Sequence, residues 1–313
     1  MLGLELAKQY YEACAKEVLN SQFAHIMPYL AIGLAGSGSE CYGYDDNISL
    51  DHDFEPGFCI FLPEESIVDR RTAFLLERAY AKLPNEFMGI KRNPVNPVGG
   101  SRHGVIRIAD FFSQKVGSAD GNLSLEEWFT VPEYGLLEAT NGEVFFDAYG
   151  QFTRIREKLS YFPEDVRLKK LAGHLLIMGQ AGQYNYFRCI SRKETAAAQL
   201  AIFEFVQSAL HVIFLLNKSY MPYYKWSFRK LRDLPELSEL AKDLEHLLSS
   251  GNTEAEVTEK TKIIQNICTA ISQELQFQGL VKAKCAEMEM LAYTVNENIK
   301  DLNIRNLNIL EGV

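Results

Sequence analysis

The 313-residue chain lacks several features that would place it in a well-defined class of proteins. Its six cysteines are scattered and form no Cys-x-x-Cys pair, which argues against a disulfide framework and against a zinc ribbon. Basic residues are also in deficit, because the net charge is −9. Such a chain has no general positive footprint for phosphate backbones, so a long nucleic acid is not expected as a partner.

Long apolar runs are missing as well. No stretch of the sequence approaches the roughly 18 apolar residues that a membrane span requires. The N-terminal stretch MLGLELAKQYYEACAKEVLN carries charges at helical intervals, and it lacks the uninterrupted apolar core of a signal peptide. The sequence therefore predicts a cytoplasmic protein without a membrane partner.

Hydrophobic residues make up 47% of the chain, enough for a sizeable core, and their spacing differs between the two halves. Up to residue 151, helical patterns alternate with short apolar runs that predict strands, such as YLAIGLAG, HDFEPGFCIFLP, HGVIRIADFF and GEVFFDAYG. From residue 152 onward the patterns are helical. We therefore predict an α+β protein with an α/β domain over residues 1–151 and an all-α helical bundle over residues 152–313.

Small residues and acidic residues lie close together between residues 36 and 53. Gly36 and Ser37 follow the first predicted strand, and a turn of this composition lets backbone N–H groups and hydroxyls approach phosphate oxygens. Asp51 and Asp53 stand two residues apart, so on a strand both carboxylates face one side and can hold a hard cation such as Mg²⁺. A Gly-Ser turn alone is an ordinary strand-to-helix connection. Together with the acidic pair it favours a site for phosphoryl or nucleotidyl transfer.

The pattern Gly36-Ser37 followed by Asp51-x-Asp53-Phe54 resembles the nucleotidyltransferase superfamily, which includes DNA polymerase β and kanamycin nucleotidyltransferase. The resemblance covers most of residues 30–235 and implies a mixed sheet with flanking helices in the first domain. Longer stretches are similar to a bacterial group of nucleotidyltransferase-like proteins of unknown function, namely GSGSECYGYDDNISLDHDF, GEVFFDAYGQFTRIREKLSYFPEDV and YMPYYKWSFRKL.

The resemblance implies roles for individual residues. Gly36 and Ser37 would contact the terminal phosphates of an incoming nucleoside triphosphate, with Ser39 as a second hydroxyl contact. Asp51 and Asp53 would bind the metal ions. One position departs from the family pattern, because the residue between the two aspartates is usually aliphatic and is His52 in this chain.

A third carboxylate normally follows on a later strand of the same sheet. Asp110, at the end of the predicted strand HGVIRIADFF, is the first choice, and Asp147 in EVFFDAYG is the alternative. In the second domain, Lys225 lies among the aromatic residues of PYYKWSF. Its side chain either packs between helices with these neighbours or supplies positive charge to the triphosphate.

These features predict a Mg²⁺-dependent nucleotidyltransferase with a two-metal site formed by Asp51, Asp53 and Asp110. The donor would be a nucleoside triphosphate, with ATP as the expected one, and the acceptor would be a small molecule or a protein. The alternative is a nucleotide-binding regulatory or antitoxin-like interaction module, in which the α/β domain performs no transfer. The acidic pair favours the enzyme over the module.

Overall fold

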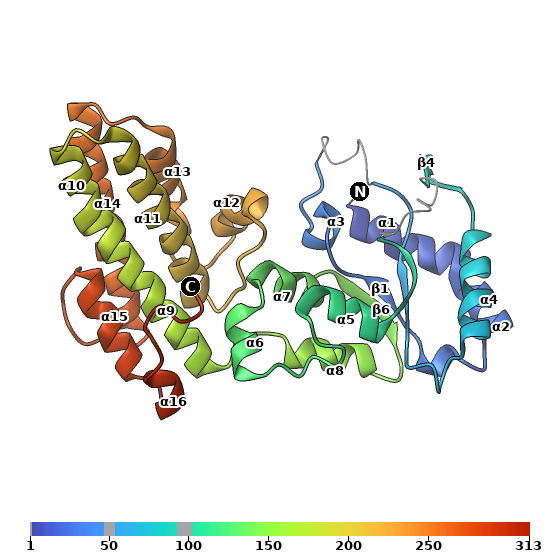
Figure 1. Ribbon diagram of the computed structural model, residues 1–313. Helices are drawn as coiled ribbons and strands as arrows, with labels where there is room; N and C mark the ends of the chain where they lie inside the picture. Colours follow the sequence, from blue (N-terminus) through green and yellow to red (C-terminus); the bar gives the residue numbers. More distant parts are fainter. Residues whose placement is uncertain (1, 47–53, 93–101) are drawn as a thin grey trace. The chain divides into compact units, whose positions relative to one another are not determined.

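The computed structural model describes residues 2–46, 54–92 and 102–313, and it confirms the predicted α+β class. Two compact units make up the chain (Figure 1). The sheet unit comprises Met1–Leu123 and Gly135–Ser160, and the helical unit comprises Ser124–Tyr134 and Tyr161–Val313. The predicted division of the chain at residue 151, between an α/β domain and a helical bundle, stays a prediction.

A four-stranded mixed sheet forms the centre of the sheet unit, with the strand order β5-β2-β1-β6. Strand β1 pairs in the antiparallel sense with β2 and with β6, whereas β2 and β5 are parallel. Gly33 of β1 lies opposite Cys59, and Cys59 lies opposite Gly104. This register brings the C-terminal end of β1 and the N-terminal ends of β2 and β5 together at one end of the strands. The strands of the sheet are β1 Ala31–Leu34, β2 Cys59–Leu62, β5 Gly104–Arg107 and β6 Glu143–Asp147, and a separate hairpin consists of β3 Glu86–Phe87 and β4 Ile90–Lys91.

Helices cover both faces of this sheet (Figure 1). Side chains alternate between the faces along β2, so Ile60 and Leu62 join the core beneath α1, α2 and α4, while Phe61 faces the other way. Phe61 stacks on Phe152 of α8 with ring centroids 4.0 Å apart, and it also contacts Phe111 of α5. The helices of this unit are α1 Gly3–Tyr10, η1 Tyr11–Ala15, α2 Lys16–Gln22, η2 Met27–Tyr29, α3 Ser39–Tyr42, α4 Arg70–Ala81, α5 Ile108–Val116 and α8 Gln151–Lys158, and α7 Glu133–Thr140 begins in the helical unit and ends here.

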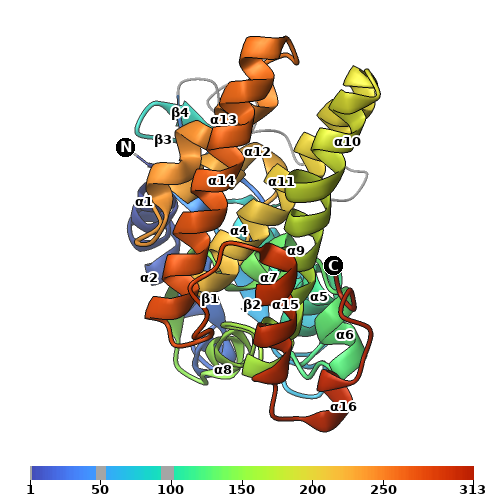
Figure 2. The ribbon, with the colours of Figure 1, turned by 90° about the vertical axis from the view of Figure 1, so that its left-hand side faces the viewer.

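The helical unit is a bundle in which α9 packs against α11 and α15, and α14 packs against α11 and α15 (Figure 2). A capping box at Thr253 and Glu256 fixes the start of α14, as the threonine cap in the sequence predicts. The residues described for this unit contain no strand. Its helices are α6 Leu125–Thr130, α9 Glu164–Met178, η4 Gly179–Asn185, α10 Tyr186–Ser191, α11 Thr195–Leu216, α12 Tyr224–Arg232, η5 Ser238–Leu240, α13 Ala241–Ser249, α14 Glu254–Phe277, α15 Met288–Glu297 and α16 Leu302–Arg305.

Helix α11 is long and apolar enough to cross a membrane by length and composition, with a mean hydropathy of 1.7 over its most apolar 18 residues. The expectation that no stretch of the chain approaches such a run is therefore wrong for this helix. Two thirds of that window, 67%, is buried inside the structure, and a core helix meets the same criteria. The segment is a buried helix of the bundle core.

Several ionisable side chains are buried inside the helical unit. The rings of His174 and His211 stack with centroids 4.2 Å apart, and His211 Nδ1 lies 3.0 Å from Glu133 Oε1. The other oxygen of Glu133 accepts a hydrogen bond from the Met221 backbone N–H at 2.9 Å. Burial alone would raise the pKa of Glu133, but the His211 hydrogen bond and charge and the Met221 amide bring it below its usual value.

Candidate functional site

The glycine-rich turn after β1 lies at the end of the sheet where β1 finishes and where β2 and β5 begin. Gly36 has a φ of 118°, a conformation that residues with a Cβ rarely adopt, so the turn requires glycine at this position. The backbone of Gly36 is held by one side chain, Asn141. The amide nitrogen of Asn141 donates to Gly36 O at 2.8 Å, and its oxygen accepts from Gly36 N at 2.9 Å.

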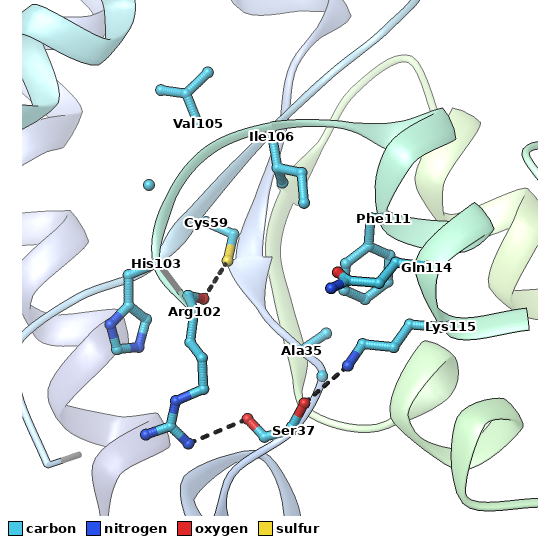
Figure 3. A pocket seen from close by; sticks show the side chains of 12 residues that line it. Ala35, Ser37, Cys59, Arg102, His103, Val105, Ile106, Phe111, Gln114 and Lys115 are labelled. Atoms are coloured by element: carbon cyan, nitrogen blue, oxygen red, sulfur yellow. Dashed lines mark hydrogen bonds between the residues drawn. The ribbon is translucent and has the colours of Figure 1, made fainter. Parts of the chain in front are cut away.

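A cavity of about 260 Å³ opens beside this turn (Figure 3). Its wall combines the turn with the starts of β2 and β5 and with the side chains of α5. Apolar side chains, including Ile106 and Phe111, form one part of the lining, and Arg102, Ser37 and Lys115 supply polar groups. A small cavity with a few convergent polar groups is the usual form of a ligand site.

Lys115, on α5, places its ammonium group at the turn. Its Nζ donates to Ser37 Oγ at 2.8 Å (Figure 3). It also donates to Glu138 Oε2 at 2.6 Å, and only 12% of its side chain is exposed. An ammonium has three N–H donors. Among the residues that the structure describes, two of these donors have partners, which leaves one for a ligand in the cavity.

Arg102 lies on the opposite side of the turn. Its Nη1 is 3.4 Å from both Ser37 O and Glu40 Oε1. Glu40 is 6% exposed, and burial raises its pKa while the Arg102 charge opposes that rise. The guanidinium is therefore held beside the turn by a buried carboxylate, with 28% of its side chain exposed.

The floor of the cavity is formed at the start of β2. The Cys59 thiol donates to Arg102 O at 3.1 Å (Figure 3). Burial raises the pKa of Cys59 to about 12, so the sulfur is a neutral thiol at physiological pH and not a nucleophile. His103 Nδ1 lies 3.0 Å from Glu55 Oε1 and forms the neighbouring part of the wall.

The structure brings some of the predicted site residues together. Gly36 and Ser37 line the cavity, whereas Ser39 begins α3 on the same turn and does not line it. The N–H of Gly36 is used by Asn141, so a phosphate contact through this amide is not available in this arrangement. Asp51 and Asp53 lie outside the described residues, and their predicted role as metal ligands stays a prediction.

The expectation that Asp110 ends a strand is wrong. The strand β5 stops at Arg107, and Asp110 lies exposed in the first turn of α5. Ile108, Phe111 and Phe112 are buried at the spacing i, i+3, i+4, which is the period of a helix and not of a strand. Arg107 donates to Pro63 O at 2.7 Å and does not line the cavity.

The alternative carboxylate, Asp147, is hydrogen-bonded to backbone amides at the start of α8. Its two oxygens accept from Gly150 N and Thr153 N, both at 2.8 Å, and so cap the start of α8. Asp147 pairs with Ala31 at the start of β1, whereas Gly36 follows the end of that strand. Asp147 therefore lies at the opposite end of the strands from the turn.

Lys225 belongs to the helical unit, in the first turn of α12. Its side chain is exposed, and its Nζ lies 5.2 Å from the ring centroid of Trp226. The predicted contact of Lys225 with a triphosphate stays a prediction.

The described residues alone do not form a metal site. They contain no group of three or more His, Cys, Asp or Glu side chains placed to hold an ion. The carboxylates nearest to the cavity are Glu40, Glu55 and Glu138, and each faces a cationic or imidazole side chain at 3.4 Å or less. A divalent cation would therefore depend on Asp51 and Asp53.

Three residues of the site were not found by reasoning from sequence, namely Lys115, Glu138 and Asn141. Asn141 is separated from Gly36 by 105 residues, and Lys115 from Ser37 by 78. No local pattern marks such pairs. The one available signal was Lys115 itself, a cation near the end of an amphipathic segment that follows a predicted strand.

Comparisons with known proteins give limited matches. Residues 128–227 match a family described as a domain of unknown function, DUF4037. A crystal structure of a nucleotidyltransferase-like protein from Exiguobacterium sibiricum is 11% identical, with a TM-score of 0.36, over 93% of this chain and 89% of that chain. No curated protein matches the chain. The TM-score is too low to support an argument, and the family match begins after the residues that line the cavity.

Proposed function

We propose that the cavity binds the phosphates of a nucleoside triphosphate, and that the protein transfers the nucleoside monophosphate to an acceptor. The observation that supports this proposal most directly is the position of Lys115. Its ammonium group is fixed at the glycine turn by Ser37 and Glu138 and retains one donor without a described partner on the wall of the cavity. A fixed cation with a spare donor suits a phosphate oxygen.

Arg102 and Ser37 extend the same argument. The guanidinium of Arg102 stands across the turn from Lys115, so two cations flank Ser37, with Arg102 donating to its backbone oxygen and Lys115 to its hydroxyl (Figure 3). Preorganised positive groups offset the charge that develops on a leaving pyrophosphate. Gly36 would contribute by its shape, since its φ of 118° lets the chain turn back beneath the phosphates.

In the proposed reaction an acceptor hydroxyl or amine attacks the α-phosphorus of the triphosphate. The bond between the α-phosphorus and the bridging oxygen breaks, pyrophosphate leaves with that electron pair, and the acceptor loses its proton. Ser37 would contact the outgoing phosphates through its hydroxyl, whereas the predicted contact of Ser39 rests on the family resemblance, since Ser39 does not line the cavity. Mg²⁺ held by Asp51 and Asp53, with Asp110 as the proposed third ligand, would neutralise charge on the phosphates when bound.

Several finer parts of this proposal rest on the family resemblance alone. These are ATP as the donor, a small molecule or a protein as the acceptor, and a contact between Lys225 and the triphosphate. The proposed cytoplasmic location rests instead on the scattered cysteines. The position of Asp110 in α5 counts against a fixed third ligand on the sheet.

The experiment incubates the protein with each of the four labelled nucleoside triphosphates, Mg²⁺ and a cell extract, and follows transfer of the label. Asp51→Ala and Asp53→Ala should each lower transfer by at least about 100-fold, because each removes charge stabilisation at the reacting phosphates. Asp69→Ala is the matched control, since Asp69 caps α4 by accepting from Thr72 N at 2.7 Å and does not line the cavity. Transfer that survives both variants would contradict the proposed reaction.

The exposed position of Asp110 favours one second candidate, a nucleotide-binding regulatory or antitoxin-like module without transfer. The same experiment separates the two functions. Binding of a nucleotide that depends on Lys115, without label on any acceptor, would support the module. Loss of transfer in Asp110→Asn would support the enzyme with its predicted third carboxylate.

A further inference from the structure

Asn141 holds the glycine turn without lining the cavity. It follows the last residue of α7, and its carboxamide makes a reciprocal pair of hydrogen bonds with the N–H and the C=O of Gly36, at 2.9 and 2.8 Å. This pair imitates the bonding between two strands just beyond the end of β1. Because the residue does not line the cavity, its effect on a ligand there has to pass through the turn.

The surrounding structure fixes the position of Asn141 itself. Arg156, on α8, donates from Nη2 to Thr140 O at 2.5 Å and to Asn141 O at 2.8 Å. The next residue, Gly142, packs so closely on β1 that a Cβ at this position would lie 1.9 Å from Leu34 O. The chain at the end of α7 is therefore held in place by the hydrogen bonds from Arg156 and by the close packing of Gly142 on β1.

The same helix end also holds the cation of the site. Glu138, three residues before Asn141, accepts from Lys115 Nζ at 2.6 Å, and Lys115 donates in turn to Ser37 Oγ. One helix end thus fixes Gly36 through Asn141 and Lys115 through Glu138. Asn141 and Glu138, which do not line the cavity, therefore fix the Gly36 backbone before Ser37 and the Lys115 ammonium beside its hydroxyl.

We propose that Asn141 is a positioning residue for anion binding, which keeps the Gly36–Ser37 turn in its binding conformation before the ligand arrives. This inference rests on the proposed function, because it requires the cavity to take phosphates. Without the carboxamide, the ligand itself has to order the backbone at Gly36. The entropy of ordering about one residue corresponds to roughly a ten-fold loss of affinity.

The chain offers a matched control for this residue. Asn217, in the helical unit, makes the same reciprocal pair with the backbone of Glu236, where both hydrogen bonds are 3.0 Å. Both variants therefore remove a reciprocal pair, and Asn217→Ala also removes the bond from its amide nitrogen to Ile213 O at 2.9 Å. We expect Asn217→Ala to unfold at a temperature reduced at least as much as that of Asn141→Ala, while only Asn141→Ala loses affinity for an anion.

The test measures binding of inorganic tripolyphosphate by titration calorimetry to the full-length wild type and to both variants. The expected result is about ten-fold weaker binding to Asn141→Ala and unchanged binding to Asn217→Ala. Exchange of the Gly36 amide proton, followed by NMR, should be faster in Asn141→Ala and unchanged in Asn217→Ala. If Asn141→Ala does not fold, Arg156→Lys leaves the carboxamide in place, frees its backbone, and should weaken binding about three-fold.

Two results would overturn the inference, and they can be told apart. Equal affinity of wild type and Asn141→Ala, with wild-type binding intact, removes the positioning role and leaves the proposed function standing. Absence of tripolyphosphate and nucleotide binding in the wild type removes both, because the cavity then has no anion to position.

Discussion

Lys115 in the sheet unit and Lys169 and Lys260 in the helical unit are all largely withdrawn from solvent, but their ammonium groups have different surroundings. Lys169 Nζ donates to Asn296 Oδ1, Arg305 O and Leu307 O at 2.8 to 3.0 Å. Lys260 Nζ likewise has three acceptors, from Gln199, Ser250 and Asn252, at 3.0 to 3.3 Å. Lys115 has two described acceptors and borders a cavity.

The difference separates a structural cation from one that is available to a ligand. Burial lowers the pKa of Lys169 and of Lys260, and neutral oxygens occupy every donor of each ammonium. Such a lysine links chain segments, and none of its three N–H donors remains for a ligand. Lys115 is anchored by the Glu138 carboxylate and the Ser37 hydroxyl, and its third donor has no partner among the described residues and borders the cavity. Burial of a lysine alone therefore does not identify a functional site.

The largest effect is expected from Lys169→Met. This change removes one donor from three partly buried oxygens, of which Arg305 O keeps the amide of Asn296 at 3.3 Å, and we expect the free energy of unfolding to fall by about 3 kcal/mol. Urea denaturation measures the loss, and Lys242→Met, an exposed lysine on α13, should change it by less than about 0.5 kcal/mol. Binding of tripolyphosphate should be unchanged in both variants. A Lys169→Met protein that is as stable as wild type would contradict the structural role.

Lys115→Met should produce the opposite result. We expect tripolyphosphate binding to weaken by about 2 kcal/mol, or roughly 30-fold, because a charged hydrogen bond to phosphate is lost. The free energy of unfolding should fall by about 2 kcal/mol, less than in Lys169→Met, because the largely buried carboxylate of Glu138 loses its partner. Calorimetric titration of both lysine variants compares them directly. If Lys169→Met weakened binding as much as Lys115→Met, the distinction between the two kinds of lysine would be lost.

The buried histidines make the helical unit sensitive to acid. His174 is 7% exposed, its Nδ1 has no partner among the described residues, and burial, with His211 and Lys170 nearby, lowers its pKa well below 6.5. The unfolded chain takes up a proton near pH 6.5 and the folded chain does not. The free energy of unfolding should therefore be highest above pH 6.5 and fall below it, by up to about 1.4 kcal/mol per pH unit.

Urea denaturation between pH 7.5 and 5 measures this slope. His174→Phe keeps a flat ring against His211 and should abolish the part of the slope below pH 6.5 that His174 contributes. Glu133, whose pKa is lowered in the fold, adds a further loss only below about pH 4.5. A slope that persists unchanged in His174→Phe would assign the acid sensitivity to other groups.

The smallest effect is expected from Ser37→Ala. The variant removes one acceptor from Lys115 and one hydroxyl from the cavity, and it leaves the Gly36–Asn141 pair in place. We expect about three-fold weaker tripolyphosphate binding, or roughly 0.7 kcal/mol, which corresponds to one neutral hydrogen bond. Ser21→Ala, which removes an exposed hydroxyl on α2, is the control. An effect as large as that of Lys115→Met would mean that the hydroxyl is the main anchor of the anion.

The sequence was informative where the pattern is local. The alternating patterns in the first half and the helical periods in the second predicted the α/β part and the bundle, whereas the mixed sheet was implied by the family resemblance. The apolar run ending at Gly36 and Ser37 was correctly placed as a strand followed by a turn. The error at Asp110 has a physical cause, because β-branched residues continue from β5 into α5 and conceal the change of period after Arg107.

The remaining part of the site depends on distant pairs. Gly36 and Asn141, or Lys115 and Glu138, meet only because β6 lies beside β1 and α7 lies beside α5. A single sequence carries no periodic signal for such contacts. The same limit explains why Lys115 was overlooked, since its surroundings, and not its residue type, distinguish it from Lys169.

The way in which the two units alternate along the chain limits how recombination can exchange them between genes. The polypeptide passes between them at residues 123–124, 134–135 and 160–161, and the second passage lies within α7. Neither unit corresponds to one uninterrupted stretch of coding sequence, so a single recombination breakpoint cannot donate either of them whole to another gene. A lineage that keeps the Gly36–Ser37 turn together with Asn141 on one uninterrupted stretch thus has to keep residues 124–134 of the helical unit as well.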